Sequence, residues 1–316
     1  MAAASLLPLG SGLFLGWTLG ANDSANVFGT AVATRIVTLR KASLLCGITV
    51  VLGAMAQGTA GIRTLSGLTE QSITTAVIVS ISAALTMTVL TFLRIPASTS
   101  QSVVGAILGI GLATGSASFN GLSKIIICWV ATPIGSIIMA CVIYKLLGYI
   151  IYKIPMSMLS RDKILWSGLL VVGTYGSYAL GANNVTNSTG IFSGLIPGLS
   201  DRILAAIGGI AIAAGVITYS KRVMLAVGSG IMSLDAFAAF VAVLSMAITV
   251  HIFAIIGVPV STSQGIVGAI IGVGIMRRTK AINYRTLGNI GFGWIMTPAA
   301  SLILSAAAFA IWKGMY

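Results

Sequence analysis

Long apolar runs separated by short polar segments cover almost the whole chain. A helix needs about 20 apolar residues to cross a bilayer, and runs of this length recur throughout the sequence. The pattern predicts an all-α polytopic membrane protein, because a membrane barrel would show short alternating segments instead. We expect ten crossings, at residues 5–34, 42–62, 72–93, 100–117, 124–147, 165–191, 202–219, 234–257, 262–276 and 287–312.

Composition supports this assignment and limits the meaning of the charge. Hydrophobic residues make up 57% of the chain and charged residues only 7%, against about 25% charged residues in soluble domains. The net charge is +13, with 18 basic and 5 acidic residues. In a soluble protein this excess would indicate nucleic acid as a partner. Here the basic residues lie between apolar runs, so we expect them to orient the chain in a lipid bilayer.

The basic residues also predict which ends of the spans face the cytoplasm. If loops alternate sides, one side receives only Arg63, Lys124, Arg202 and Lys313. The other side receives the remaining 14 of the 18 basic residues. The positive-inside rule makes this second side cytoplasmic. The chain is therefore expected to be a multi-pass protein of the cell membrane with both termini extracytoplasmic.

Three polar motifs occur twice, in the same order. Their offsets are 161, 163 and 165 residues, which indicates an internal duplication with small insertions. The pairs are GANDSAN at Gly20–Asn26 and GANNVTN at Gly181–Asn187, PASTSQS at Pro96–Ser102 and PVSTSQG at Pro259–Gly265, and WVATP at Trp129–Pro133 and WIMTP at Trp294–Pro298.

The duplication predicts two transmembrane repeats. Repeat 1 is expected at 1–150 and repeat 2 at 164–316, with a cytoplasmic linker at 151–163 between them. Five crossings per half would turn the second repeat upside down, and in inverted repeats of this kind the transport site lies near the membrane midplane. Whether the PxSTSQ segments cross the membrane or re-enter from one side stays open.

The GAND and GANN segments are candidate cation sites. As one straight helix, residues 5–38 would measure about 51 Å, which exceeds a hydrocarbon core of ~30 Å, so a break is expected near Gly20. Asp23 inside an apolar span costs roughly 3 kcal/mol and needs a partner. Amide and carboxylate oxygens suit a hard cation, with Na⁺ first and H⁺ as the alternative. An Asn-rich turn at a membrane edge is the competing interpretation. The candidate ligands are Asn22, Asp23, Asn26, Asn183, Asn184 and Asn187.

The PxSTSQ segments are candidate anion sites. Each places hydroxyls after a proline and before an apolar helix, where Ser and Thr cap the helix and the first N–H groups lack partners. Helix starts of this kind bind phosphate or sulfate. Ordinary capping after a proline is the alternative. The candidate ligands are Ser98, Thr99, Ser100, Gln101, Ser261, Thr262, Ser263 and Gln264.

Other functional classes fit the sequence less well. Two broken helices could line an anion channel, although channels usually gain symmetry from several subunits. An intramembrane enzyme is disfavoured, because the spans carry no His/Asp/Glu cluster and no serine beside a base. His251 lies within an apolar span, where a proton relay competes with a packed and hydrogen-bonded role.

The duplicated motifs resemble those of the inorganic phosphate transporter (PiT) family over nearly the whole chain. The resemblance implies symport of phosphate with Na⁺ or H⁺, with some relatives carrying sulfate. It also implies that Asp23, Asn26, Asn184 and Asn187 contact ions, and that the STSQ residues contact phosphate. The chain departs from the family pattern at Asn184, where many relatives carry Asp, and at Gln57, where many carry an intramembrane Glu.

These departures favour Na⁺ over H⁺, because fewer carboxylates leave fewer protonatable groups. We therefore expect a secondary transporter that couples Na⁺ to inorganic phosphate by alternating access, with no cofactor beyond the coupling ion. The alternatives are a symporter of sulfate or another oxyanion, an H⁺-coupled phosphate transporter and, less favoured, an anion channel. Homo-oligomerisation and the cation stoichiometry stay open.

Overall fold

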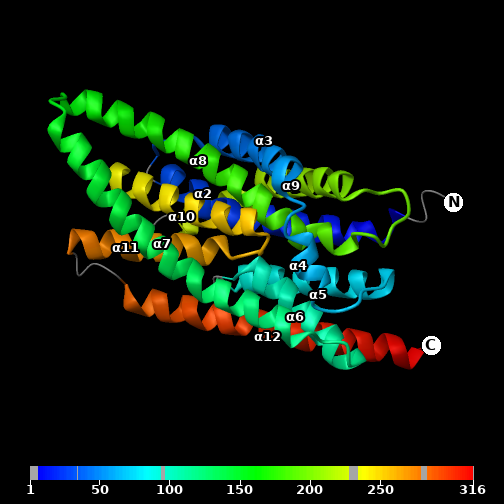
Figure 1. The fold of residues 1–316 in the computed structure, drawn as a ribbon. Coiled ribbons are helices and arrows are strands. Elements are labelled where there is room, and N and C mark those ends of the chain that lie inside the picture. The colour runs from blue at the N-terminus through cyan, green and yellow to red at the C-terminus, as the bar shows by residue number, and fades with distance from the viewer. Residues whose placement is uncertain (1–5, 34, 94–96, 228–233, 279–282, 316) are drawn as a thin grey trace.

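A computed structural model describes residues 6–33, 35–93, 97–227, 234–278 and 283–315, and all regular structure in these ranges is helical (Figure 1). The helices of the first half are α2 (Leu9–Ala33), α3 (Leu39–Gln57), α4 (Ile62–Ser66), α5 (Ile73–Phe92), α6 (Thr99–Thr114) and α7 (Phe119–Lys153). Those of the second half are α8 (Met158–Ser188), the 3₁₀ turn η1 (Gly190–Phe192), α9 (Asp201–Val227), α10 (Ala236–Ile256), α11 (Thr262–Arg277) and α12 (Tyr284–Met315).

The all-α membrane fold predicted from the apolar pattern is confirmed. Seven of the described helices are long and apolar enough to cross a membrane, and large side chains such as Leu44, Ile127 and Ile303 are exposed on the outside, where lipid would cover them. The ten longer helices of the described chain follow the ten predicted segments in order. Only residues 154–157 lie outside helices between α7 and α8, so helices cover most of the segment expected to link the repeats.

Two pairs of helices form hairpins that enter from opposite ends of the molecule. In Figure 1, α5 and α6 occupy the right-hand part and α10 and α11 the left-hand part. The helices α6 and α11 have 16 residues each, about 24 Å, which is shorter than a ~30 Å hydrocarbon core. The predicted crossings at 100–117 and 262–276 thus correspond to helices shorter than a full span, which favours re-entrant PxSTSQ segments. The predicted crossings at 72–93 and 234–257 correspond to α5 and α10, which are long and apolar enough to span a membrane.

Equivalent helices of the two halves exchange partners across the molecule. Helix α2 packs along α9, and its counterpart α8 packs along α3. In the same way α6 packs along α12, and α11 along α7. These reciprocal contacts are compatible with the inverted repeats expected from the sequence.

Glycines allow the exchanged helices to touch through their backbones. A Cβ atom at Gly20 would lie 1.9 Å from the carbonyl oxygen of Ile212, and one at Gly181 would lie 2.0 Å from that of Val50. Both distances are far below any real Cβ contact, so only glycine fits at these crossings. The interface of small residues follows the general rule for helix packing in membranes.

The WxxTP motifs lie where the hairpins meet these long helices. Pro133 lies inside α7 and Pro298 inside α12. A Cβ atom at Gly268 of α11 would come within 2.3 Å of the Pro133 carbonyl oxygen, and one at Gly105 of α6 within 2.2 Å of the Pro298 oxygen. A proline leaves the carbonyl one turn before it without its usual helical donor and bends the helix. The glycine-rich hairpin helices pack against these proline turns.

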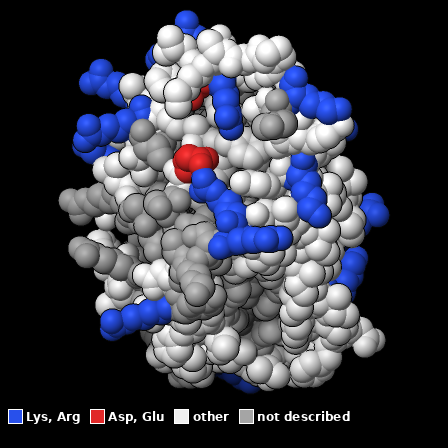
Figure 2. All heavy atoms as spheres, turned by 90° about the vertical axis from the view of Figure 1, so that its left-hand side faces the viewer, with Lys and Arg blue, Asp and Glu red and all other residues white. Residues whose placement is uncertain are grey.

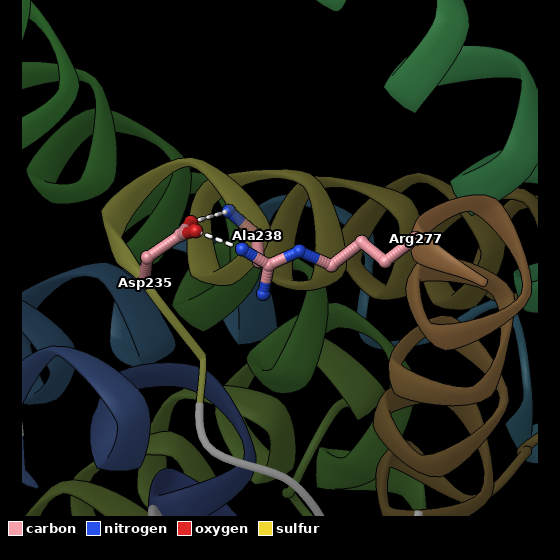
Figure 3. Close-up of polar contacts among 3 residues, drawn as sticks. All are labelled: Asp235, Ala238 and Arg277. Atoms are coloured by element: carbon pink, nitrogen blue, oxygen red, sulfur yellow. Dashed lines mark hydrogen bonds and ion pairs between the residues drawn. The ribbon is translucent and has the colours of Figure 1, made fainter. Parts of the chain in front are cut away.

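Basic side chains gather at one end of the molecule (Figure 2). The N- and C-termini lie at the right-hand end of Figure 1. Figure 2, which faces the left-hand end, shows many Lys and Arg side chains there. Asp235 caps α10 at this end, accepting a hydrogen bond from the Ala238 N–H at 2.8 Å, and forms an ion pair with Arg277 of α11 (Figure 3). This contact closes the base of the α10–α11 hairpin.

Candidate functional site

The tips of the two hairpins contact each other through matching bonds. Ser100 of α6 donates from Oγ to the Val260 carbonyl oxygen at 2.9 Å. Ser263 of α11 donates from Oγ to the Ala97 carbonyl oxygen at 3.1 Å. The two STSQ segments, 163 residues apart in the sequence, therefore lie side by side in the interior. Pro96, which begins the first of these motifs, lies outside the described residues.

Each hairpin tip also contacts the GAN segment of the opposite repeat. Asn26 of α2 donates from Nδ2 to Thr262 Oγ1 at 3.2 Å and to Ser263 Oγ at 3.3 Å. Asn187 of α8 donates from Nδ2 to Ser100 Oγ at 2.9 Å. Both motifs of both repeats thus meet in one buried polar cluster, which we call the central site.

Ser98 and Ser261 act as helix caps. Their side-chain oxygens accept hydrogen bonds from the backbone N–H groups of Gln101 and Gln264, at 3.4 and 3.2 Å. The capping interpretation therefore applies to these two hydroxyls. Thr99, Ser100, Thr262 and Ser263 occupy the first turns of α6 and α11 and are all buried. They stand beside helix starts, which offer N–H groups to an anion.

Helix α2 runs without interruption through Gly20–Asn26, so the predicted break at this segment is wrong. Helix α8 is likewise continuous through Gly181–Asn187 and ends at Ser188. The side chains of these segments bond to the hairpins and not to a broken backbone. No break is needed to fit the helix into the hydrocarbon core. Helix α2 begins at Leu9, and its 25 residues span about 38 Å, a length that a tilted helix accommodates.

Asp23 is a buried carboxylate with few protein partners. It is 3% exposed. Its Oδ2 accepts a hydrogen bond from Thr99 Oγ1 at 3.4 Å, and its Oδ1 has no partner among the described residues. The Arg277–Asp235 contact is the one ion pair within the described chain, so no described basic side chain pairs with Asp23. A carboxylate in this setting needs a cation or a proton.

Asn184 occupies the position equivalent to Asp23 but has a different hydrogen-bond environment. Its Oδ1 accepts from Asn187 Nδ2 at 3.0 Å and from Asn183 Nδ2 at 3.2 Å, and Ser100 Oγ, which donates to Val260, lies 3.3 Å away. Its Nδ2 has no partner in the part of the chain that the structure describes. The amide oxygen is saturated, whereas the amide nitrogen has hydrogen bonds left to give.

Asn22 and Asn183 have partners that the sequence did not predict. Asn22 donates from Nδ2 to Thr91 Oγ1 of α5 at 2.8 Å. Asn183 makes a two-point contact with the backbone of Val260, donating to its carbonyl at 2.7 Å and accepting from its N–H at 3.2 Å. Asn183 therefore fixes the tip of the α10–α11 hairpin to α8. Sequence reasoning missed this partner, because the contact is with the main chain of Val260 and does not depend on its side chain.

Gln101 and Gln264 contribute further oxygens to the cluster. Each side chain is 4% exposed, and each Oε1 lacks a partner within the described ranges. Buried polar atoms are normally hydrogen-bonded, so unpartnered oxygens in one cluster are informative. Together with Asp23 Oδ1, they are suited to an incoming cation or to a donor on a protonated oxyanion.

His251 is held by neutral groups outside the central site. Its Nε2 lies 2.6 Å from Gln57 Oε1, and its Nδ1 lies 2.8 Å from the Tyr175 hydroxyl. Because an amide oxygen only accepts, Nε2 carries the proton and Nδ1 accepts from the tyrosine. This network accounts for both ring nitrogens and favours the packed role over a relay. The same contact occupies Gln57, the residue that stands where many relatives have Glu.

Comparison with known proteins places these features in context. The sequence profile of the phosphate transporter family matches residues 19–305. An inferred phosphate permease of Methanocaldococcus jannaschii is 31% identical over 291 residues, covering 92% of each chain. The sulfate permease CysP of Bacillus subtilis is 29% identical over 301 residues, covering 93% of this chain and 84% of CysP. A solved structure of a sodium-dependent phosphate transporter superposes with a TM-score of 0.87 at 23% identity, covering 99% of this chain and all of that one.

Proposed function

Because the chain belongs to the phosphate transporter family, we propose that it carries inorganic phosphate across the cell membrane together with Na⁺, by alternating access. The family and the fold are those of transporters and not of enzymes. The observation that carries the proposal is Asp23, a buried carboxylate without a described basic partner that lies beside the starts of α6 and α11. An acid of this kind needs a cation, and helix starts favour an anion, so the two ligands stabilise each other's binding.

In this proposal the hairpin starts bind the anion. The hydroxyls of Thr99, Ser100, Thr262 and Ser263, with nearby backbone N–H groups, surround a tetrahedral oxyanion. The caps Ser98 and Ser261 hold the two helix starts in shape. Gln101 and Gln264 belong to the same turns, and their unpartnered oxygens accept from the protonated oxygen of phosphate.

The cation site is built around Asp23, with Asn26 beside it. The sequence also gave Asn22, Asn183, Asn184 and Asn187 as ligands of Na⁺. Asn22 and Asn183 bond to hairpin residues, so in our proposal they position the hairpins. Asn187 bonds to Ser100 and belongs to the same cluster.

The two hairpins provide a route to alternating access. They enter from opposite ends and meet at the central site, so movement of one hairpin opens the site to one side only. The end with many Lys and Arg side chains (Figure 2) is proposed to face the cytoplasm, which puts both termini outside. Residues 1–150 and 164–316 then act as the two inverted repeats, joined at 151–163.

Sulfate is the second candidate substrate, and the similarity to CysP supports it. Hydroxyls and N–H groups accept either oxyanion. Monoprotonated phosphate keeps a hydrogen-bond donor that sulfate lacks, and the unpartnered acceptor oxygens of Gln101 and Gln264 suit that donor. We therefore place phosphate first.

Flux measurements on purified protein in liposomes test the proposal. Uptake of ³²P-phosphate should be saturable, should accumulate phosphate under an inward Na⁺ gradient, and should fall in Asp23→Asn. Uptake driven equally well by K⁺ or by a proton gradient would refute Na⁺ coupling. Competition between phosphate and sulfate separates the two substrates, and uptake of sulfate alone would refute phosphate.

A further inference from the structure

We infer that Asn184 faces the transported anion and not a coupling cation, so that the carrier has one cation pocket, at Asp23, where the duplicated sequence provides for two. The inference rests on the proposed function, because it assigns roles within the proposed site. It is carried by the difference between two equivalent positions of the same chain.

The positions of Asp23 and Asn184 are equivalent in detail. Each lies three residues after the glycine that touches a helix of the other repeat, Gly20 or Gly181. Each is almost fully buried, at 3% and 1% exposure. The two positions match in place and burial, so the chemistry of the two side chains and of their hydrogen-bond partners decides what each can bind.

Asp23 can only accept. Its Oδ2 accepts a hydrogen bond from Thr99 at 3.4 Å, the Thr262 hydroxyl lies near the same carboxylate, and Oδ1 is unpartnered within the described chain. A charge buried this deeply is costly unless a positive partner compensates it. A single Na⁺ at this carboxylate meets that need.

The side-chain oxygen of Asn184 is not available to a cation, because other side chains already donate to it. The backbone of Val260 fixes this orientation of the amide. The Val260 carbonyl requires an N–H group from Asn183, and the Val260 N–H requires an oxygen from it. Asn183 is thereby locked with its Nδ2 also facing Asn184. The atom of Asn184 that receives this N–H must be Oδ1, so the orientation of the amide follows from main-chain contacts.

The consequence is an unpartnered N–H donor in the central site. Asn187 also donates to Asn184 Oδ1, and Ser100 Oγ lies 3.3 Å from the same oxygen, which leaves Nδ2 as the group with hydrogen bonds to give. Because Ser100 lies in the first turn of α6, the donor stands next to a helix start. An amide N–H repels a cation and donates to an oxyanion. At the position where Asp23 binds a cation in the first repeat, Asn184 therefore offers an N–H donor to the anion in the second repeat.

Stoichiometry follows from the same difference. Among the described buried polar residues of the two hairpin tips, α2 and α8, Asp23 is the one that carries a formal charge. One monovalent cation neutralises it. We expect one Na⁺ per phosphate, measured as the ratio of ²²Na and ³²P fluxes in liposomes under a Na⁺ gradient.

Variants at position 184 test the anion role. Asn184→Ala removes the donor and should raise the phosphate KM by about tenfold or more with the flux ratio still at about one. Asn184→Asp adds an acceptor charge and should make phosphate binding depend on a second Na⁺, moving the ratio toward two. Asn283→Asp is the matched control, because it adds a carboxylate at an exposed cap that Asp can also provide.

The outcomes separate the inference from the proposed function. A wild-type ratio of two, or an Asn184→Ala KM within about twofold of wild type, overturns the inference while leaving Na⁺-coupled transport intact. Uptake that ignores Na⁺ in the wild type refutes the proposed function, and the phosphate KM of Asn184→Ala then still decides the anion role. Gel filtration checks folding, and Asn184→Ser replaces any variant that fails it.

Discussion

Replacing Gly181 by alanine should destabilise the protein through the crossing of α8 and α3. A Cβ atom added there would lie 2.0 Å from the Val50 carbonyl oxygen and 2.8 Å from its carbon, where real contacts are not found below 3.0 Å. The two helices must therefore part by roughly 1 Å. Overpacking of this kind costs about 1–3 kcal/mol, and we expect the upper end because both sides of the contact are backbone.

Transport should fall as well, because the displacement reaches the central site. Gly181 lies two residues before Asn183, which holds the hairpin tip at Val260. The assay is thermal melting of the purified protein in detergent, followed by phosphate uptake in liposomes. Gly291→Ala is the control: nothing lies within 4 Å of the added carbon, and Ala is favoured over Gly inside a helix by about 1 kcal/mol. Equal melting temperatures and equal uptake for Gly181→Ala and wild type would refute the backbone-contact argument.

Three further changes probe other parts of the structure. Asn183→Asp cannot donate to the Val260 carbonyl, so uptake should drop at least about tenfold in a folded protein, and unaltered uptake would show that this contact does not position the hairpin. Asp235→Asn keeps the helix cap and loses the surface ion pair, so it should lower the free energy of unfolding by under about 1 kcal/mol. Asp235→Ala loses both contacts and should cost about 1 kcal/mol more. Hydrogen exchange at the start of α10 measures the difference, and equal exchange in the two variants would refute the role of the cap. His251→Gln, whose amide can bond to Gln57, should keep uptake and its pH profile, and a lost or shifted profile would restore the proton relay.

Local sequence was sufficient for the class of protein and for the residues of the cluster. Apolar runs long enough for a bilayer predict membrane helices whatever their packing, because lipid forces every backbone group to bond within its own helix. The repetition of STSQ and GAN segments selected the hydroxyls and amides that meet at the central site. Ser100 and Asn187 were candidates from the sequence motifs alone, and in the structure Asn187 Nδ2 lies 2.9 Å from Ser100 Oγ.

The same local reasoning failed where long-range contacts decide. The expected break in α2 depended on the idea that Asn and Asp would bond to a freed backbone, whereas Asn26 bonds to hairpin hydroxyls supplied from 236 and 237 residues away. Apolar content likewise cannot tell a full span from one arm of a hairpin, and the crossing predicted at 262–276 falls on α11, which has only 16 residues. Hairpin depth is set by which helices the arm packs against, such as α7 beside α11.

The sequence by itself determined that two copies of the same polar motifs lie in membrane helices. It also determined that the second copy carries Asn184 where the first carries Asp23. Only the tertiary structure decided which atoms these copies turn toward each other. The reason is physical: a side chain such as Asn183 or Asn184 carries both a donor and an acceptor, and its residue type does not say which one faces the site. That orientation is set by partners such as Val260, which folding brings from a distant part of the chain.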